Sequence, residues 1–153
     1  MINATINSLL ITRKNLIQNI ENLTEEQLLF IPKGFNNNIL WNFGHIIVSQ
    51  QLLCYAKAGL PLLVPQNLVD SFRKATFPKD WENPIAFSEL KALAISTIEQ
   101  FKLDLEQNKF SNYEAYPTSS GFELKNIEDA ILYSQHHEGY HTGVIASLKS
   151  LLN

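Results

Sequence analysis

Hydrophobic residues recur every three or four positions along four stretches of the chain, and polar residues fill the positions between them. In the first stretch this spacing predicts an amphipathic helix over about residues 3 to 22. Its hydrophobic face consists of Ile6, Leu9, Leu10, Leu16, Ile17, Ile20 and Leu23. No stretch alternates between hydrophobic and polar residues for long enough to predict a sheet.

Capping residues and helix-stop signals place the other three helices. Asn38 is a good N-cap for a second helix, which should end near Gly59 because a glycine followed closely by proline is a C-terminal signal. Ser88 is a candidate N-cap for a third helix that should end near residues 107–108. Asn126 caps a fourth helix, which continues to the end of the sequence.

The segments between these helices are irregular in sequence. Residues 24–27 fit a capping box that opens one short extra turn. Residues 60–87 contain four prolines and a possible short helix at residues 68–72, and residues 109–125 read as a loop. A connection as long as 60–87 is unusual in a small helical domain. Its aromatic residues either pin it to the helices or line the mouth of a pocket: Phe72, Phe77 and Trp81.

Four amphipathic helices of about five turns each predict an all-α protein, a four-helix bundle with a long connection between its second and third helices. A chain of 153 residues with 45% hydrophobic residues is long enough for one compact domain, so we expect a single domain over residues 1–153. In such bundles, metal and cofactor sites are built from side chains on facing helices.

The fourth helix carries two histidines on its hydrophobic face. His137 and His141 are four residues apart and therefore project from the same side of the helix, whereas His136 points away from them. The same face also carries Ile127, Ala130, Ser134, Val144, Ile145, Leu148 and Leu152. One histidine there is usually a hydrogen-bonded core residue. Two are harder to bury, since each unpaired polar nitrogen costs about 1–3 kcal/mol, and a shared metal ion removes that cost.

A third histidine lies on the hydrophobic face of the second helix. His45 shares this face with Trp41, Val48, Leu52 and Ala56. If the two faces meet, His45, His137 and His141 form a site for a divalent metal ion. Three neutral imidazoles bind such ions well and leave a coordination position for water or substrate.

Charge and cysteine content narrow the class of function. The chain has 12 Lys and Arg against 15 Asp and Glu, a formal charge of -3, and no basic cluster, which argues against nucleic acid or an acidic membrane as partner. The only cysteine, Cys54, has hydrophobic neighbours and is expected to be a buried, inert thiol. The N-terminal residues do not resemble a secretory signal, and no hydrophobic run is long enough to span a bilayer. A cytoplasmic location is the simplest expectation.

Two short motifs resemble the DinB-like (DinB/YfiT) superfamily of metal-dependent enzymes. They are Trp-Asn-Phe-Gly-His-Ile at residues 41–46 and His-Glu-Gly-Tyr-His-Thr-Gly-Val-Ile at residues 137–145. The resemblance implies an up-down-down-up bundle that is often a homodimer, and it implies that His45, His137 and His141 bind zinc, nickel or a similar ion. Many relatives read His-Arg-Gly-Gln-Ile from the last ligand onward, whereas residues 141–145 here read His-Thr-Gly-Val-Ile, so an arginine and a glutamine are missing.

Relatives in this wider group include S-transferases that use a low-molecular-weight thiol such as bacillithiol. The resemblance therefore implies a metal-dependent thiol S-transferase that acts on a small-molecule substrate in detoxification. A thiol on a divalent cation loses its proton at neutral pH, which gives a reactive thiolate. The alternatives are a hydrolase that uses metal-bound water, and a non-catalytic metal-stabilised binding or stress-response module. No catalytic residue is assigned. Glu138 is expected to be a solvated residue more often than a hydrogen-bond partner of a ligand, and Tyr140 is expected to point off the face.

Overall fold

The computed structural model describes residues 2–152, and within them it confirms a mostly helical, all-α protein with one very small sheet. Four helices are long, and they correspond to the four hydrophobic stretches. The elements are α1 (Ile2–Ile20), α2 (Glu25–Leu29), α3 (Ile39–Gln50), α4 (Gln66–Phe72), α5 (Phe87–Glu106), β1 (Tyr116–Pro117), β2 (Glu123–Leu124) and α6 (Ile127–Ser150).

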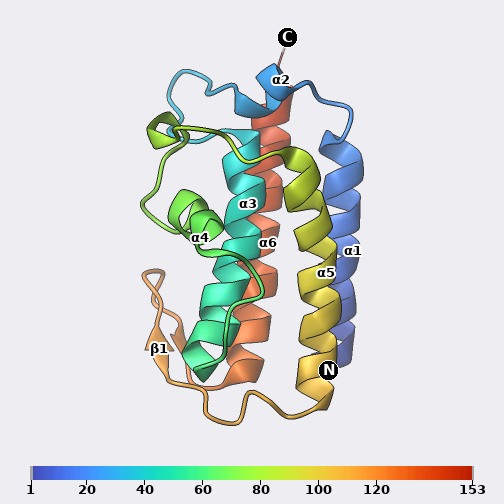
Figure 1. The fold of residues 1–153 in the computed structure, drawn as a ribbon, viewed down its shortest axis with the longest axis vertical. Helices are drawn as coiled ribbons and strands as arrows, with labels where there is room; N and C mark the ends of the chain where they lie inside the picture. Colours follow the sequence, from blue (N-terminus) through green and yellow to red (C-terminus); the bar gives the residue numbers. More distant parts are fainter. Residues whose placement is uncertain (1, 153) are drawn as a thin grey trace.

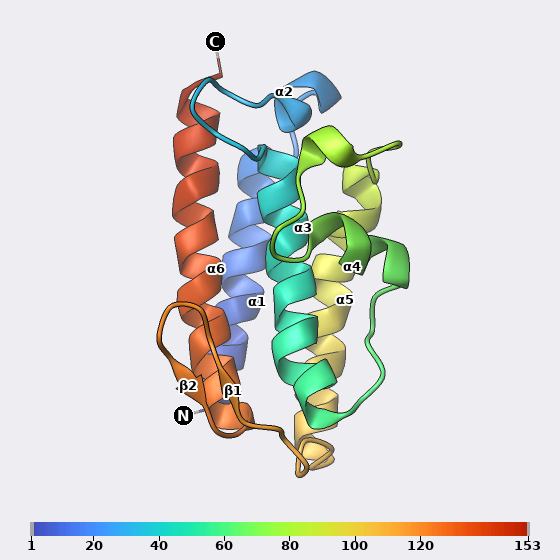
Figure 2. The same cartoon turned by 90° about the vertical axis from the view of Figure 1, so that its left-hand side faces the viewer.

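The four long helices α1, α3, α5 and α6 lie side by side (Figure 1). Helices α1 and α6 run toward the end of the molecule that carries α2, and α3 and α5 run the opposite way. Helix α6 packs against both α1 and α3, while α4 packs on the outside of α3 (Figure 2). This arrangement places the hydrophobic faces of α3 and α6 opposite each other.

The second long helix ends where the sequence predicted, but its last two turns are not α-helical. A π-helical turn (Gln51–Tyr55) and a 3-10 turn (Ala56–Ala58) continue α3 to Gly59, which adopts a left-handed conformation with φ of 69°. Glycine tolerates this conformation at the end of a helix. Hydrophobic spacing does not reveal which carbonyl each amide pairs with, so the π-helical turn could not be predicted.

Two sequence predictions about the connections need correction. Helix α5 begins at Phe87, and its N-cap is Ala86 rather than Ser88, with no side-chain capping bond. The Phe87 ring packs against the Phe43 ring, with centroids 5.5 Å apart, so packing rather than a cap sets this start. Residues 109–125, predicted to be a loop, contain the antiparallel pair β1 and β2. Strands of two residues are too short to produce an alternating pattern.

Other local predictions are confirmed by hydrogen bonds. The capping box is present: Thr24 Oγ1 accepts from Gln27 N, and Gln27 Oε1 accepts from Thr24 N. Asn38 caps α3 by accepting from Trp41 N at 2.7 Å, and Asn126 caps α6. Short side chains with an oxygen at these positions satisfy amide groups that have no partner within the helix.

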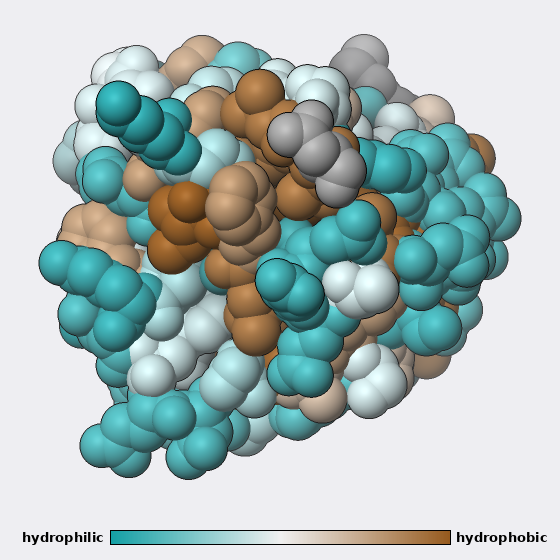
Figure 3. Space-filling model, turned by 90° about the horizontal axis from the view of Figure 1, so that it is seen from above, coloured by the Kyte–Doolittle hydropathy of each residue, from teal (hydrophilic) through white to brown (hydrophobic). Residues whose placement is uncertain are grey.

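Buried hydrophobic residues form two clusters, one near each end of the four long helices. At the end that carries α2, hydrophobic residues also reach the surface near the centre of the face, with hydrophilic residues around them (Figure 3). Exposed hydrophobic residues from segments at this end include Phe30, Phe35 and Leu151. Among residues 2–152, no helix combines the length and the hydrophobicity needed to cross a membrane.

Candidate metal centre

The structure brings together His45 from α3 with His137 and His141 from α6. One ring nitrogen from each of the three side chains lies within 4.8 Å of the others. The ring centroids are 5.1 Å apart for His45 and His137, 4.7 Å for His45 and His141, and 4.5 Å for His137 and His141. The two hydrophobic faces therefore do meet, and three imidazoles share one location inside the molecule.

His45 is held by the long connection between the second and third long helices. Its Nδ1 lies 2.6 Å from the carbonyl oxygen of Phe72, at the end of α4, and must carry the proton because a carbonyl can only accept. The ring stacks on Trp41 at a centroid distance of 4.4 Å. With Nδ1 occupied, Nε2 remains as the ligand atom, and Ser49 Oγ lies 3.3 Å from it.

Asn42 holds His141 in the same way. Its Oδ1 accepts a hydrogen bond from His141 Nδ1 at 2.8 Å, and its Nδ2 donates to the carbonyl oxygen of Asn38 at 2.8 Å. The second bond fixes which end of the amide faces the imidazole. Sequence reasoning did not assign a role to Asn42, although a polar residue in the hydrophobic run 39–48 was a signal. Such partners orient metal ligands and set their tautomer.

The electrostatic environment keeps all three imidazoles neutral. Burial lowers the pKa of His45, and the hydrogen bond to Phe72 opposes that shift. Burial, together with the nearby imidazole of His45, lowers the pKa of His137 to about 4. Burial, with contributions from His137 and His45, lowers the pKa of His141 to about 3. Neutral imidazole is the form that binds metal, so this donor set fits a divalent ion.

Glu138, next to His137 on α6, is neither solvated nor bonded to a histidine, so the expectation for it was wrong. Its side chain is 1% exposed, and its carboxylate accepts from Arg13 of α1, with a shortest distance of 2.6 Å. Arg13 is fully buried and also donates to the Ala94 carbonyl and to Thr97 Oγ1 of α5. Burial raises the pKa of the Glu138 carboxyl, and the Arg13 guanidinium opposes this. Sequence reasoning missed Arg13, although this residue lies on the hydrophobic face of α1, between Leu9 and Leu16.

The remaining candidate residues lie where the sequence placed them. His136 and Tyr140 are exposed, and neither belongs to the three-histidine group. Cys54 is buried, and burial raises the pKa of its thiol to about 12. A thiol with so high a pKa is not a nucleophile at neutral pH. The chemistry of the site therefore depends on the three histidines and their immediate neighbours.

A cavity of about 290 Å³ opens onto two of the three histidines. Its walls come from α3 and the turns that follow it, from α6, from the hairpin, and from the segment after α4. The residues that line it are His45, Ser49, Leu52, Leu53, Ala56, Lys57, Lys74, Tyr116, Thr118, Ser119, Tyr133 and His137. Phe72, Phe77 and Trp81 do not line it. The Phe72 and Trp81 rings instead pack against each other, with centroids 5.1 Å apart, and pin the connection to the helices.

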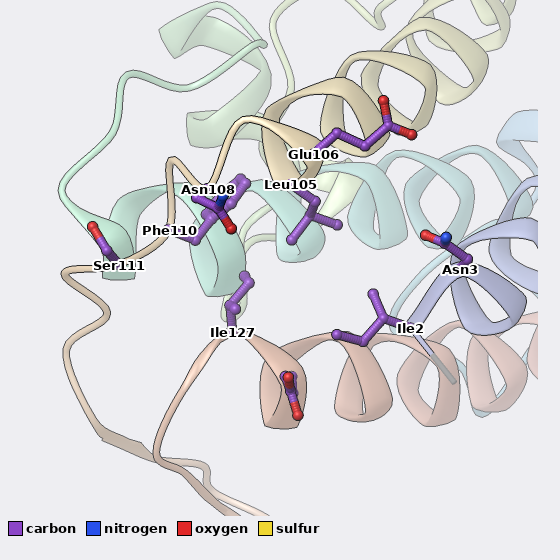
Figure 4. Close-up of a pocket in the computed structure, with 9 residues that line it drawn as sticks. Ile2, Asn3, Leu105, Glu106, Asn108, Phe110, Ser111 and Ile127 are labelled. Carbon is purple, nitrogen blue, oxygen red and sulfur yellow. The ribbon is translucent and has the colours of Figure 1, made fainter.

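A larger cavity, of about 720 Å³, lies at the end of the molecule where α1 begins and α5 ends. Ile2, Leu105 and Ile127 point toward one another across it (Figure 4). Among the described residues that line it there is no histidine and no group of three potential metal ligands. The smaller cavity is the candidate active site, because it reaches potential metal ligands.

The close approach of α4 to α3 that supports His45 requires glycine at position 44. A Cβ atom built on Gly44 would lie 2.5 Å from Cδ1 of the Phe72 ring. We expect Gly44→Ala to destabilise the protein by about 1–3 kcal/mol, because the buried ring must move, and to displace the carbonyl that holds His45. Urea unfolding and metal titration measure both effects.

Gly143→Ala is the matched control, since Gly143 is also helical and a Cβ there meets nothing within 4 Å. Replacing an unhindered helical glycine with alanine should leave the stability unchanged or raise it by up to about 1 kcal/mol. Equal stability of the two variants would show that the contact between Gly44 and Phe72 does not constrain the fold.

The fold and the site together define a helical protein with a candidate three-histidine metal centre. The family profile of the DinB superfamily matches residues 8–145. The chain therefore belongs to the DinB superfamily, and both the family and the cluster of three histidines are compatible with metal binding. A comparison with curated proteins gave no match.

Proposed function

We propose that this protein is a metal-dependent enzyme, a thiol S-transferase built on an up-down-down-up four-helix bundle. His45 and His141 would hold a divalent ion, zinc or nickel, through the ring nitrogens that do not bond to Phe72 and Asn42, and His137 would supply the third ligand. When bound, the ion supplies the Lewis acidity that lowers the pKa of a thiol and makes it a thiolate at neutral pH. Its substrates would be small molecules.

The observation that carries this proposal is the cavity of about 290 Å³ that opens onto His45 and His137. A metal whose only role is structural is normally enclosed by its protein ligands, whereas a catalytic metal keeps a position open to substrate. A cavity that opens onto two of the three histidines favours the second arrangement. The cavity therefore supports an enzyme over a non-catalytic module.

The other residues of the cavity suit a substrate with a carbon body and polar groups. Leu52, Leu53 and Ala56 provide a hydrophobic wall that holds the body and displaces water. Tyr133 precedes His137 by one helical turn, and its hydroxyl lies 3.0 Å from Ser120 Oγ in the hairpin. Ser49 thus places a hydroxyl group beside His45, and Tyr133 adds a second one to the cavity lining, where both can orient a polar group of the substrate.

In the proposed transfer, the thiol first releases its proton to solvent. The sulfur then donates an electron pair to an electrophilic carbon of the second substrate and forms a carbon–sulfur bond. The leaving group departs with the electron pair of the bond that breaks. The protein positions the two reacting atoms, and the hydrophobic wall limits competition from water.

The test is a transfer assay with the protein loaded with zinc or nickel. Bacillithiol and 1-chloro-2,4-dinitrobenzene are the substrates, and the absorbance of the thioether product is followed. We expect a rate above that of free metal at the same concentration, lost in His45→Ala and kept in His136→Ala. A rate no higher than free metal with several low-molecular-weight thiols would defeat the transferase proposal. Metal-dependent hydrolysis of an activated ester in the same protein would favour the hydrolase alternative.

A further inference from the structure

We propose that the substrate of this site is an anion, whose carboxylate or phosphate group contacts Lys74 while another of its atoms faces the three histidines. This inference rests on the metal site of the proposed function but not on the S-transfer reaction. The groups around the cavity indicate both the charge of the substrate and the residue that recognises it.

The metal centre would carry a positive charge that no nearby side chain among residues 2–152 neutralises. A divalent ion on three neutral imidazoles keeps its two positive charges. The groups that hold the ligands are also neutral, namely the Phe72 carbonyl and the Asn42 amide. Glu138 is the nearest carboxylate along α6, and its charge is already paired with that of Arg13. Among the described residues, no acidic side chain joins the three-histidine group, so an anionic ligand would supply the missing negative charge.

The charged side chains of the cavity wall are all positive. The residues that line the cavity include two lysines and no aspartate or glutamate, although the whole chain has a formal charge of -3. Lys57 is already engaged: its Nζ lies 3.6 Å from Glu114 Oε2 and 4.6 Å from the centroid of the Tyr116 ring. Lys74 forms no ion pair with any residue between 2 and 152. It is the lysine with its charge available to a ligand.

Of the two lysines, Lys74 lies nearer along the chain to the group that holds His45. It follows Phe72 by two residues, and two residues of chain span at most about 7 Å, so its backbone lies near the carbonyl that holds His45. Lys57 follows His45 by twelve residues along the same helical run, which corresponds to about 18 Å. Lys74 is therefore the lysine at the metal end, within reach of a small ligand that also contacts the histidines.

The turn that carries Lys74 is fixed by hydrogen bonds. Thr76 N donates to the Arg73 carbonyl at 3.2 Å, and Thr76 Oγ1 accepts from Trp41 Nε1 at 3.0 Å. Ala75, which directly follows Lys74, adopts a left-handed conformation with φ of 66°, which is uncommon for a residue other than glycine. The connection is thus tied to the same tryptophan that stacks on His45. This places the Lys74 backbone in a defined position relative to the site.

Binding of matched small thiols to the cobalt-loaded protein tests the proposal, with the visible spectrum of cobalt as the readout. The probes are 3-mercaptopropionate and its neutral counterpart 3-mercapto-1-propanol. We expect the carboxylate to bind about fivefold more tightly, the effect of one partly exposed ion pair. Competition by inorganic phosphate and by acetate distinguishes the two sources of negative charge, since the group recognised in nature should compete better.

Lys74→Gln should reduce the preference for the carboxylate to what the charge of the metal centre alone provides, and it should leave the affinity for the neutral thiol unchanged. Lys79→Gln is the control, because Lys79 is exposed on the same connection but does not line the cavity. Equal affinity of the wild-type protein for the two thiols, or an unchanged preference in Lys74→Gln, overturns the proposal. A preserved preference without S-transfer would overturn only the transferase reaction, whereas failure to bind cobalt would overturn both.

Discussion

We expect His45→Ala to abolish stoichiometric metal binding, and His137→Ala to do the same. Each substitution removes one of three nitrogens that lie within 4.8 Å of one another, and His45 is the only one of the three from α3. Loss of a residue that merely orients a ligand typically lowers metal affinity about 10–100-fold, so loss of the ligand itself should cost at least about 100-fold. The metal content after dialysis, measured by elemental analysis, should therefore fall from about one ion per chain to a trace.

His136→Ala is the control for this prediction. It removes an imidazole from the same helix, but that side chain is exposed and lies outside the three-histidine group. Its metal content should equal that of the wild-type protein. Circular dichroism would verify that all three variants remain helical. An unchanged metal content in His45→Ala would exclude His45 as a ligand and leave two histidines, too few for the proposed site.

The spacing of a few residues was enough to predict how the histidines are placed. His137 and His141 are one helical turn apart, and His45 lies on a hydrophobic face of its own helix, so all three had to point inward. Asn38 and Asn126 similarly predicted where α3 and α6 begin, because a cap is a local feature of the sequence. Predictions of this kind depend only on neighbours within one or two turns.

Apart from the meeting of the three histidines, features that depend on contacts between distant segments were not predicted. The cavity is lined by residues from positions 45 to 137, and no local pattern indicates that they share a surface. The group that holds His45 is the backbone carbonyl of Phe72. Every residue has such a carbonyl, so the presence of a phenylalanine at position 72 does not indicate this role. The ion pair of Arg13 and Glu138 joins residues 125 positions apart. Each of these residues has an ordinary structural interpretation when it is considered alone.

We expect Glu138→Ala to destabilise the protein by about 3–5 kcal/mol, because it leaves the charge of Arg13 buried and without its partner. For a chain of this length the change corresponds to a fall in Tm of about 10 °C. Arg13→Ala should have a similar effect, since it strands the carboxylate instead. Thermal and urea unfolding of the metal-free variants measure the loss independently of any effect at the metal centre.

A surface pair provides the comparison. Lys91 of α5 pairs at 3.8 Å with Glu21, the residue that follows α1, but their side chains are 45% and 41% exposed, so Lys91→Ala should cost less than about 1 kcal/mol. The double variant Arg13→Met with Glu138→Leu removes both charges and should be less destabilised than either single variant, because no charge is left unpaired. The free energy of unfolding of the double variant could instead fall by the sum of the two single decreases. In that case hydrogen bonds and packing, rather than the stranded charge, account for the loss of stability. The pair would then act mainly by fixing α6, and with it His137 and His141, against α1 and α5.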